Sequence, residues 1–384
     1  MKILQVIPYF APAWGFGGPV KVCYQISKEL VKDGHQITVW TTDASDGQTP
    51  IKVLDETIDG IFVKRFRNVL PKLTHGYNVF TPIGFSNYAE KEISSYDLVH
   101  CHSFFTYQNI IISKLCKSKK IPYIIHLHEM PIPHTMLGKK SIKIIFNFFF
   151  GKSILKNATR IIVVSPREKE LLAKYLPSVD KKIEVVPNPI EPYQAKLDKK
   201  EAQKNEKVIL FLGRLSFIKG LDRLIRAFGE LIKKDSSYRL IIAGPDENNN
   251  LTKLTNLAKE LGAQDKVEFV GLVSKAQKEE VFKRADIFAL FSLYESFSIA
   301  TLEALQHDLP CCLSKNIGVA SQIETAGCGI IINNIEDSSE CAEKLALTYE
   351  MRYKLSRNCA RSLAPFELSR VTLLITNIYK EIIS

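Results

Sequence analysis

Short runs of β-branched and apolar residues alternate with helix-like stretches along almost the whole chain. This rhythm is the feature that most constrains the fold, because it predicts parallel sheets covered by helices. In the first half the expected strands are Ile3–Ile7, Ile37–Thr41, Ile61–Arg65, Leu98–His102, Tyr123–Leu127, Arg160–Val164 and Ile183–Val186.

The rhythm breaks at Pro187-Asn188-Pro189 and a polar stretch at 194–207, and then restarts. The expected strands of the second half are Val208–Leu212, Arg239–Ala243, Lys266–Val270, Ile287–Phe291, Pro310–Leu313 and Gly329–Ile332. Its expected helices are Gly220–Lys233, Leu251–Leu261, Ala276–Arg284 and Phe297–Gln306. We therefore expect an α/β protein with two Rossmann-like, doubly wound domains that face each other across a cleft. Their expected bounds are 1–190 and 208–364, joined by a linker at 191–207 and followed by a C-terminal helix at 365–384.

Length and composition agree with two domains. The 384 residues are too many for one ordinary core, and 46% hydrophobic with 24% charged residues is typical of globular proteins. Met1–Pro8 has too short an apolar run for a secretory signal, and no segment has 18 consecutive apolar residues. The eight cysteines show no C-x-x-C pair or zinc spacing, and Cys311-Cys312 lie in an apolar run as expected for buried thiols. These features predict a cytoplasmic location.

The net charge of +11 is concentrated in one place, since no acidic residue occurs between Glu129 and Glu168. Lysines and arginines in that interval alternate with Ile and Phe. Residues 139–156 are therefore predicted to form a basic amphipathic helix that associates peripherally with an anionic membrane face. A core-facing helix with a solvated basic face is the open alternative. Nucleic-acid binding is disfavoured because the stretch is too apolar.

Two cations lie between an expected strand and an expected helix. Arg214 and Lys219 occur in Gly213-Arg214-Leu215-Ser216-Phe217-Ile218-Lys219-Gly220. This position corresponds to the carboxyl end of a strand beside a helix N-terminus, where an arginine fork and a lysine bind and stabilise a diphosphate. The alternative is an ordinary pair of surface cations.

Two carboxylates follow about 80 residues later. Glu295 is expected to end a loop and Glu303 to lie in the next helix, where carboxylates accept hydrogen bonds from sugar hydroxyls. The backbone N–H groups of Phe297, Ser298 and Ile299 would open that helix and point at phosphate. Two surface glutamates on one helix are the alternative.

Glycines and histidines mark the ends of strands in the first half. The turn Gly15-Phe16-Gly17-Gly18-Pro19 does not match G-x-G-x-x-G because Pro19 interrupts it, which disfavours NAD binding. His100 and His102 close one strand, and His126 and His128 close another. A zinc site is disfavoured there for lack of further ligands, and His128 is expected as a hydrogen-bond donor to substrate. No D-x-D pair occurs, so we expect no metal and no cofactor, with Arg214 and Lys219 neutralising the diphosphate.

Taken in order, these motifs resemble a family 4 retaining glycosyltransferase of the GT-B fold over essentially the whole chain. The residues that carry the resemblance are Gly17-Gly18-Pro19, His128, Val163-Val164-Ser165 with Glu168, Val185-Val186-Pro187-Asn188, Gly213-Arg214 to Lys219-Gly220, and Glu295 to Glu303.

The resemblance implies a catalytic and donor-binding set. Arg214 and Lys219 would bind the donor diphosphate, Glu295 would hold the transferred sugar and Glu303 the ribose. Gly17 and Gly18 would let the backbone approach the phosphates, His128 would lie by the sugar, and Leu272 would frame the base. The family transfers with retention by front-face attack, in which the leaving phosphate takes the acceptor's proton. The 1–190 domain would be the acceptor side and 208–364 the nucleotide-sugar side.

The chain departs from the family pattern at Ser298, at His307-Asp308 and at Asn316-Ile317-Gly318, where the family has small residues or glycines. The expected acceptor is a growing glycan or lipid-linked glycan in cell-surface polysaccharide assembly. Two rival interpretations remain open: a non-catalytic protein that binds a nucleotide sugar, and a GT-B sugar epimerase.

Overall fold

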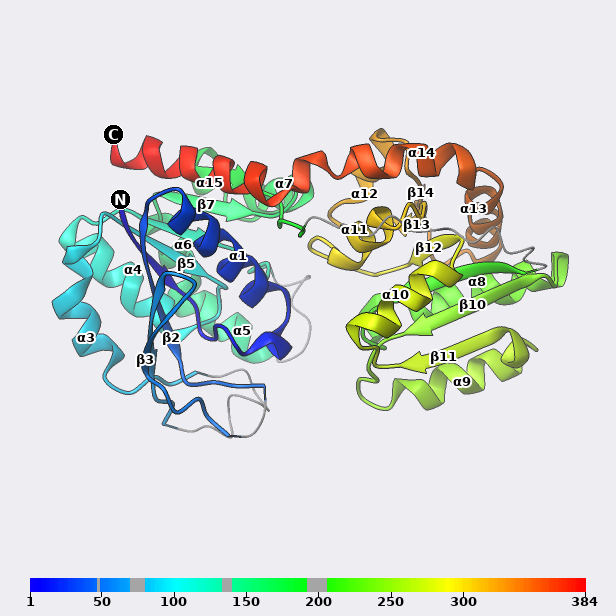
Figure 1. Ribbon diagram of the computed structural model, residues 1–384, viewed down its shortest axis with the longest axis horizontal. Coiled ribbons are helices and arrows are strands. Elements are labelled where there is room, and N and C mark those ends of the chain that lie inside the picture. Colours follow the sequence, from blue (N-terminus) through cyan, green and yellow to red (C-terminus); the bar gives the residue numbers. More distant parts are fainter. Residues whose placement is uncertain (47–48, 70–79, 133–139, 192–205) are drawn as a thin grey trace. The chain divides into compact units, whose positions relative to one another are not determined.

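The computed structural model describes residues 1–46, 49–69, 80–132, 140–191 and 206–384. The chain divides into two compact units (Figure 1). The first unit is Met1–Glu191 with Phe366–Ser384, and the second is Pro192–Pro365. Most of the expected linker, 192–205, lies outside the described residues. Each unit is an α/β fold with a sheet of its own, which confirms the predicted fold class.

The first unit contains an eight-stranded sheet in the order β3-β4-β2-β1-β5-β6-β7-β8. Its strands are β1 (Lys2–Val6), β2 (Gln36–Thr42), β3 (Asp55–Ile58), β4 (Ile61–Phe66), β5 (Leu98–His102), β6 (Tyr123–His126), β7 (Arg160–Val163) and β8 (Ile183–Val185). All pairs are parallel except β3 with β4. The seven predicted strands are confirmed, and β3 is an additional edge strand.

Helices cover both faces of this sheet, as side-chain alternation requires. They are α1 (Gly18–Lys32), α3 (Phe85–Glu92), α4 (Tyr107–Lys119), α5 (Lys140–Phe146), α6 (Lys152–Asn157), α7 (Pro166–Tyr175) and α15 (Leu368–Ile383). Ile124 packs in a core with α1 and α15. Its neighbour Tyr123 points to the opposite face, where its hydroxyl donates to the carbonyl oxygen of Ile154 in α6 and lies 3.0 Å from Ser113 Oγ in α4.

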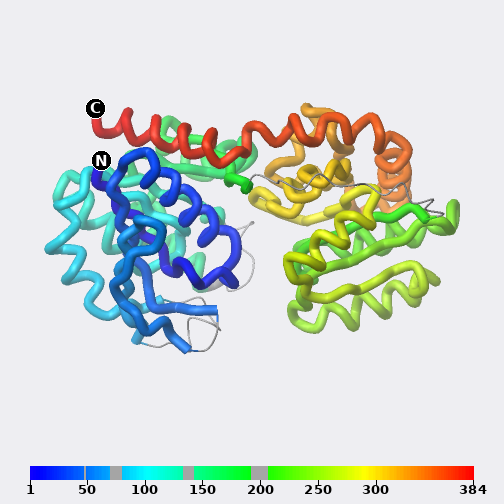
Figure 2. Tube along the Cα trace, viewed as in Figure 1, coloured from blue at the N-terminus to red at the C-terminus, as the bar shows by residue number. Residues whose placement is uncertain are grey.

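The sequence predicts helix α15 but not what it packs on. In the structure its apolar face, including Val371 and Ile375, joins the core formed by α1 and β1. Met1 and Ile382 pack against the same cluster, so both chain ends lie on the first unit (Figure 2). The last helix therefore returns to the unit in which the chain begins.

The second unit contains a six-stranded parallel sheet in the order β11-β10-β9-β12-β13-β14. Its strands are β9 (Lys207–Leu212), β10 (Tyr238–Ala243), β11 (Val267–Gly271), β12 (Ile287–Leu290), β13 (Cys311–Ser314) and β14 (Gly329–Ile332). Its helices are α8 (Leu221–Lys234), α9 (Asn250–Glu260), α10 (Lys275–Arg284), α11 (Ile299–Gln306), α12 (Ala320–Thr325), α13 (Ser338–Glu350) and α14 (Arg352–Ser362). Every strand and helix predicted here is confirmed to within two residues.

The basic stretch is helical but interrupted. Helix α5 runs into a π-helical turn, η3 (Asn147–Gly151), before α6 begins. Lys139 lies outside the described residues. Within the described part of the chain, no helix has both the length and the apolar character needed to cross a bilayer. All eight cysteines are buried and none forms a disulfide, as expected for Cys311 and Cys312.

Candidate active site

The loop after β9 carries the two predicted cations, and two close backbone approaches shape it. Gly220 has φ +64°, and a Cβ there would lie 2.0 Å from the carbonyl oxygen of Phe291 at the end of β12. Only glycine therefore allows this loop to lie against the neighbouring strand. At its other end, Leu215 N–H donates to the Pro245 carbonyl oxygen after β10, at 2.9 Å. The loop is thus held between the carboxyl ends of both strands that flank β9.

Lys219 and Glu295 form an ion pair in this structure. Their side chains are 16% and 21% exposed, so the pair is largely shielded but still reaches solvent. The backbone of Glu295 is fixed on both sides, because its N–H donates to Asn316 at 3.1 Å and its carbonyl accepts from Gly318 at 2.9 Å. A cation and a carboxylate that lie 76 positions apart in sequence are thus brought into contact at one sheet edge.

Arg214 pairs with a residue that the sequence did not single out. Its Nη1 lies 2.8 Å from Oε1 of Glu247, which follows β10, and the guanidinium side chain is 61% exposed. A surface pair of this kind contributes only about 0–1 kcal/mol, so the guanidinium can exchange Glu247 for an anionic ligand at little cost. No motif in the sequence marks Glu247, because its position depends on the pairing of β9 with β10.

Glu303 also has a cationic partner that the sequence did not single out. Lys278 Nζ lies 2.6 Å from its Oε1, and the two side chains are 28% and 24% exposed. Lys278 lies in the first turns of α10, which starts with a capping box between Ser274 and Gln277. The S-x-x-Q pattern could have located this helix start from sequence, and with it Lys278.

The start of α11 has an unusual backbone. Glu295 precedes the helix and Glu303 lies within it, as predicted. Ser298 caps the helix with φ +85°, and its Oγ accepts from Thr301 N–H at 3.3 Å. A positive φ is unfavourable for residues other than glycine, which gives a physical reason for the glycine of the family pattern at this position. Phe297 is 2% exposed, and the helix begins at Ile299.

The remaining predicted donor-binding residues are Leu272 in the second unit and Gly17 and Gly18 in the first. Leu272 follows β11 and is 75% exposed. In the first unit, Gly17 caps α1 with φ +92°, and Gly18 is the first residue of that helix. Apart from its chain neighbours, no atom of the described residues would lie within 4 Å of a Cβ at Gly17, so its backbone conformation, and not crowding, favours glycine.

His128 follows β6 and belongs to a stack of four imidazoles. The rings of His126 and His128 lie 4.4 Å apart, and those of His100 and His102 are also 4.4 Å apart. Burial lowers the pKa of all four histidines, that of His128 to about 3. The stack is therefore neutral. Within the described residues, neither ring nitrogen of the buried His126 has a hydrogen-bond partner.

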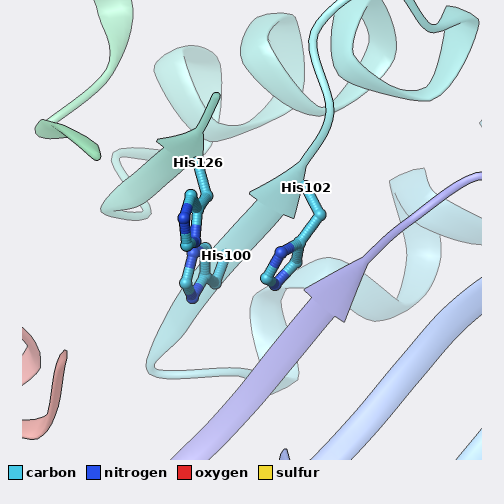
Figure 3. Close-up of side chains that lie close together, drawn as sticks. All are labelled: His100, His102 and His126. Carbon is cyan, nitrogen blue, oxygen red and sulfur yellow. The ribbon is translucent and has the colours of Figure 1, made fainter. Parts of the chain in front are cut away.

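Among the described residues, three of these histidines come nearest to forming a metal-binding set themselves (Figure 3). Ligand nitrogens of His100, His102 and His126 lie within 4.8 Å of one another. However, the rings of His100 and His126 are stacked with an interplanar angle of 11°. A metal ion lies in the plane of each imidazole that binds it, so stacked rings do not aim at one point. Both nitrogens of His102 are also already hydrogen-bonded. The residues as folded do not fit a metal ion.

Known families match both halves of the chain. Residues 16–194 match the model described as Glycosyltransferase Family 4. Residues 193–362 match the model described as Glycosyl transferases group 1.

Individual relatives match along nearly the full length. An uncharacterized glycosyltransferase of Methanocaldococcus jannaschii is 24% identical, over 99% of this chain and 98% of the relative. The GDP-mannose:cellobiosyl-diphosphopolyprenol alpha-mannosyltransferase of Xanthomonas oryzae is 26% identical, over 90% and 88%. The crystal structure of Anabaena HepE in complex with UDP has a similar fold, with a TM-score of 0.75, 18% identity and coverage of 99% and 100%.

These matches confirm the predicted recognition, the GT-B fold and the predicted activity, sugar transfer from a nucleotide-sugar donor. The chain belongs to the glycosyltransferases, with a Family 4 domain followed by a group 1 domain.

Proposed function

We propose that this glycosyltransferase moves a hexose-type sugar from a nucleoside diphosphate to a hydroxyl of a glycan or lipid-linked glycan. It does so with retention of the anomeric configuration and without a metal ion. One observation carries the proposal: Lys219 and Glu295 meet at the carboxyl edge of the second sheet, and Arg214 belongs to the same loop as Lys219. Ligands of doubly wound sheets bind at this edge.

Donor binding would exchange the partners of the two ion pairs. Lys219 and Arg214 give up Glu295 and Glu247 as partners and turn to the diphosphate, whose charge grows as it leaves. Glu295 is then released to accept hydrogen bonds from the hydroxyls of the transferred sugar. Before the donor binds, the charged side chains are paired with one another near solvent. No isolated charge therefore has to be buried in the free enzyme.

The chemical step needs no protein base. The bond between the anomeric carbon and the phosphate oxygen breaks, and the acceptor oxygen forms its bond on the same face. The departing phosphate oxygen takes the acceptor's proton. Arg214 and Lys219 neutralise the diphosphate, which is the role a divalent cation has in other sugar-nucleotide sites.

The relatives indicate the chemical class of donor and acceptor. The Xanthomonas oryzae relative is described as using GDP-mannose and a diphosphopolyprenol-linked sugar, and the Anabaena structure contains UDP. A lipid-linked glycan acceptor for this chain follows the first of these. The two names differ in the nucleotide base, so the base is what an experiment must decide.

The experiment is a donor screen followed by a transfer assay. Thermal shift of the full chain against UDP, GDP, ADP and their sugars, with and without EDTA, should give stabilisation by one base that EDTA does not remove. Incubation of that donor with polyprenyl-diphosphate-linked glycans should yield a product with the donor's anomeric configuration by NMR. Loss of transfer in EDTA, or an inverted product, would refute the corresponding part of the proposal.

The same assay separates the two rival functions. An epimerase would release free nucleotide without an acceptor and change the stereochemistry of the sugar. A binding protein would be stabilised by the donor and would release no nucleotide at all.

We also propose that α5 and η3 associate peripherally with an anionic membrane. Five apolar side chains there are between 43% and 79% exposed: Ile142, Ile144, Ile145, Phe148 and Phe149. Lys152 and Lys156 are exposed in the following helix. Apolar side chains with cations beside them match the headgroup region of an anionic bilayer.

Vesicle flotation tests this membrane proposal. Wild type should float with vesicles containing anionic lipid at low salt, and exchange of Phe148 and Phe149 for Ser should abolish flotation. Tyr353→Ser removes a similarly exposed aromatic residue from the second unit and should have no effect. No flotation of the wild type at low salt would defeat the proposal.

A further inference from the structure

A series of hydrogen-bonded, buried polar side chains ends at His128. Its members come from β1 (Gln5), β5 (His102) and α15 (Tyr379), and all three are 0% exposed. His102 Nε2 lies 2.8 Å from Gln5 Oε1, and His102 Nδ1 lies 3.1 Å from His128 Nε2. Gln5 Nε2 donates to the Tyr379 hydroxyl at 3.3 Å. Figure 3 draws His102 with two other members of the stack, His100 and His126.

With the Gln5 amide oriented as in the structure, the chemistry of each link sets where the protons lie. The amide oxygen of Gln5 can only accept, so His102 must carry its proton on Nε2. A neutral imidazole has one N–H, which leaves His102 Nδ1 as an acceptor. His128 must then donate from Nε2, and its Nδ1 keeps a lone pair.

Tyr379 orients the first link. Its hydroxyl oxygen accepts from the Gln5 amide and lies 2.6 Å from His100 Nδ1, to which it can donate its own proton. This arrangement keeps the NH₂ side of the amide toward Tyr379 and the carbonyl side toward His102. Gln5 thus contacts a residue 374 positions away in the sequence.

We propose that Gln5 and His102 are positioning residues that fix His128 in its Nε2–H tautomer, so that Nδ1 accepts a hydrogen bond from a ligand hydroxyl. His128 follows β6 at the carboxyl edge of the first sheet, and no described residue forms a hydrogen bond with its Nδ1. The ligand hydroxyl is that of a sugar, which rests on the proposed function. In this role His128 accepts a hydrogen bond from the ligand, whereas the sequence led us to expect that it donates one.

The lowered pKa values support this argument. Burial lowers the pKa of His102 well below 6.5 and that of His128 to about 3, so both rings are neutral at physiological pH. Only a neutral ring has distinct donor and acceptor nitrogens, and the partner of one nitrogen sets the role of the other.

The test reads the tautomers directly. Long-range ¹H–¹⁵N spectra of histidine-labelled full-length protein distinguish protonated from unprotonated ring nitrogens without any substrate. In wild type, His128 should be protonated on Nε2. Gln5→Leu should change the nitrogen shifts of His102 and His128. Gln5→Glu should preserve them, because a buried carboxyl group is neutral and still offers one acceptor and one donor.

The matched control is Thr42→Val, which removes a buried 2.7 Å hydrogen bond to the Pro8 carbonyl oxygen from the adjacent strand β2. It should leave both tautomers unchanged. Once a donor is known, Gln5→Leu should lower kcat/KM roughly 10-fold, the lower end of what losing the outer partner of a functional histidine costs at metal sites. Gln5→Glu should rescue this loss.

Three results would overturn the inference: a wild-type His128 protonated on Nδ1, unchanged shifts in Gln5→Leu, or equal loss of kcat/KM in Gln5→Leu and Thr42→Val. If the tautomers respond as expected but no variant transfers sugar, the proposed function fails while the positioning role stands. The spectra thus keep the two claims separate.

Discussion

The carboxyl edge of the first sheet carries buried, neutral histidines, whereas the same edge of the second sheet carries cations paired with carboxylates. His100, His102 and His126 are each 0% exposed. Lys219, Glu295, Glu303 and Lys278 retain between 16% and 28% exposure.

The difference follows from desolvation. A neutral imidazole can be buried in a core at modest cost, but a charge needs both a partner and nearby water. The first unit should therefore respond mainly to pH, and the second mainly to loss of individual charges. Each of the following experiments can break or sharpen that contrast.

The largest effect should come from the central carboxylate of the second unit. Glu295→Ala should lower kcat about 100- to 1000-fold, the size of losing one preorganised group at a reacting centre. Stabilisation by the bare nucleotide should persist, because Arg214 and Lys219 remain. Steady-state kinetics and thermal shift measure the two quantities. Glu268→Gln, which disrupts an ion pair with Arg284, should keep full activity. Unchanged turnover in Glu295→Ala would contradict its role.

Acid should destabilise the first unit. Histidines with lowered folded pKa values take up protons on unfolding below pH 6.5, so their stabilisation is present above pH 6.5 and is lost as pH falls. With a folded pKa of about 3, His128 alone should lower the free energy of unfolding by about 2 kcal/mol at pH 5 relative to neutral pH. Hydrogen exchange of β5, corrected for intrinsic rates, should accelerate between pH 7 and pH 5. Constant protection of β5 over this range would show that the histidines are not neutral and buried.

Removing the partner of Glu303 should weaken donor binding moderately. Lys278→Met leaves the Glu303 carboxylate without its 2.6 Å neutralising contact, so an uncompensated negative charge meets the anionic donor whose ribose Glu303 is expected to bind. A loss of about 1 kcal/mol raises the donor KM roughly fivefold, with kcat nearly unchanged. Lys275→Met removes an exposed lysine from the same helix and serves as the control. Equal KM values for both variants would mean that the ion pair is irrelevant to the donor.

The smallest effect concerns the backbone at the start of α11. Ser298→Gly should raise the free energy of unfolding by about 1 kcal/mol, because glycine adopts a φ of +85° without the penalty of other residues. Ser298→Ala keeps that penalty and loses the cap, so it should destabilise by about 1 kcal/mol. Urea unfolding measures both changes. Destabilisation by glycine would show that the cap outweighs the backbone strain.

The sequence predicted most of the fold because buried parallel strands are uninterrupted apolar runs. The predicted strands Val208–Leu212 and Ile287–Phe291 are confirmed for this reason. Strand β3 escaped prediction because Asp55–Ile58 is a half-exposed edge strand of mostly polar residues. The π-helical turn at Asn147–Gly151 also leaves no clear pattern in the sequence.

The site was predicted as residue types at strand ends, but not as contacts. The spacing of Lys219 and Glu295 cannot reveal that they pair, since that depends on β9 lying beside β12. Glu247 and Lys278 were missed because their roles arise only from neighbouring elements. Likewise, Gln5 reads as an ordinary strand residue until Tyr379 returns from the end of the chain.

The most direct test of the account is calorimetric titration of the best nucleotide diphosphate from the screen into wild type, Arg214→Ala and Arg239→Ala. Arg239 is a comparable arginine, paired with Glu206 near the start of β10. Arg214→Ala should weaken binding at least about 100-fold, as loss of a charge-assisted phosphate contact implies, while Arg239→Ala binds like wild type. Equal affinities of all three proteins would contradict the claim that the carboxyl edge of the second sheet holds the donor diphosphate.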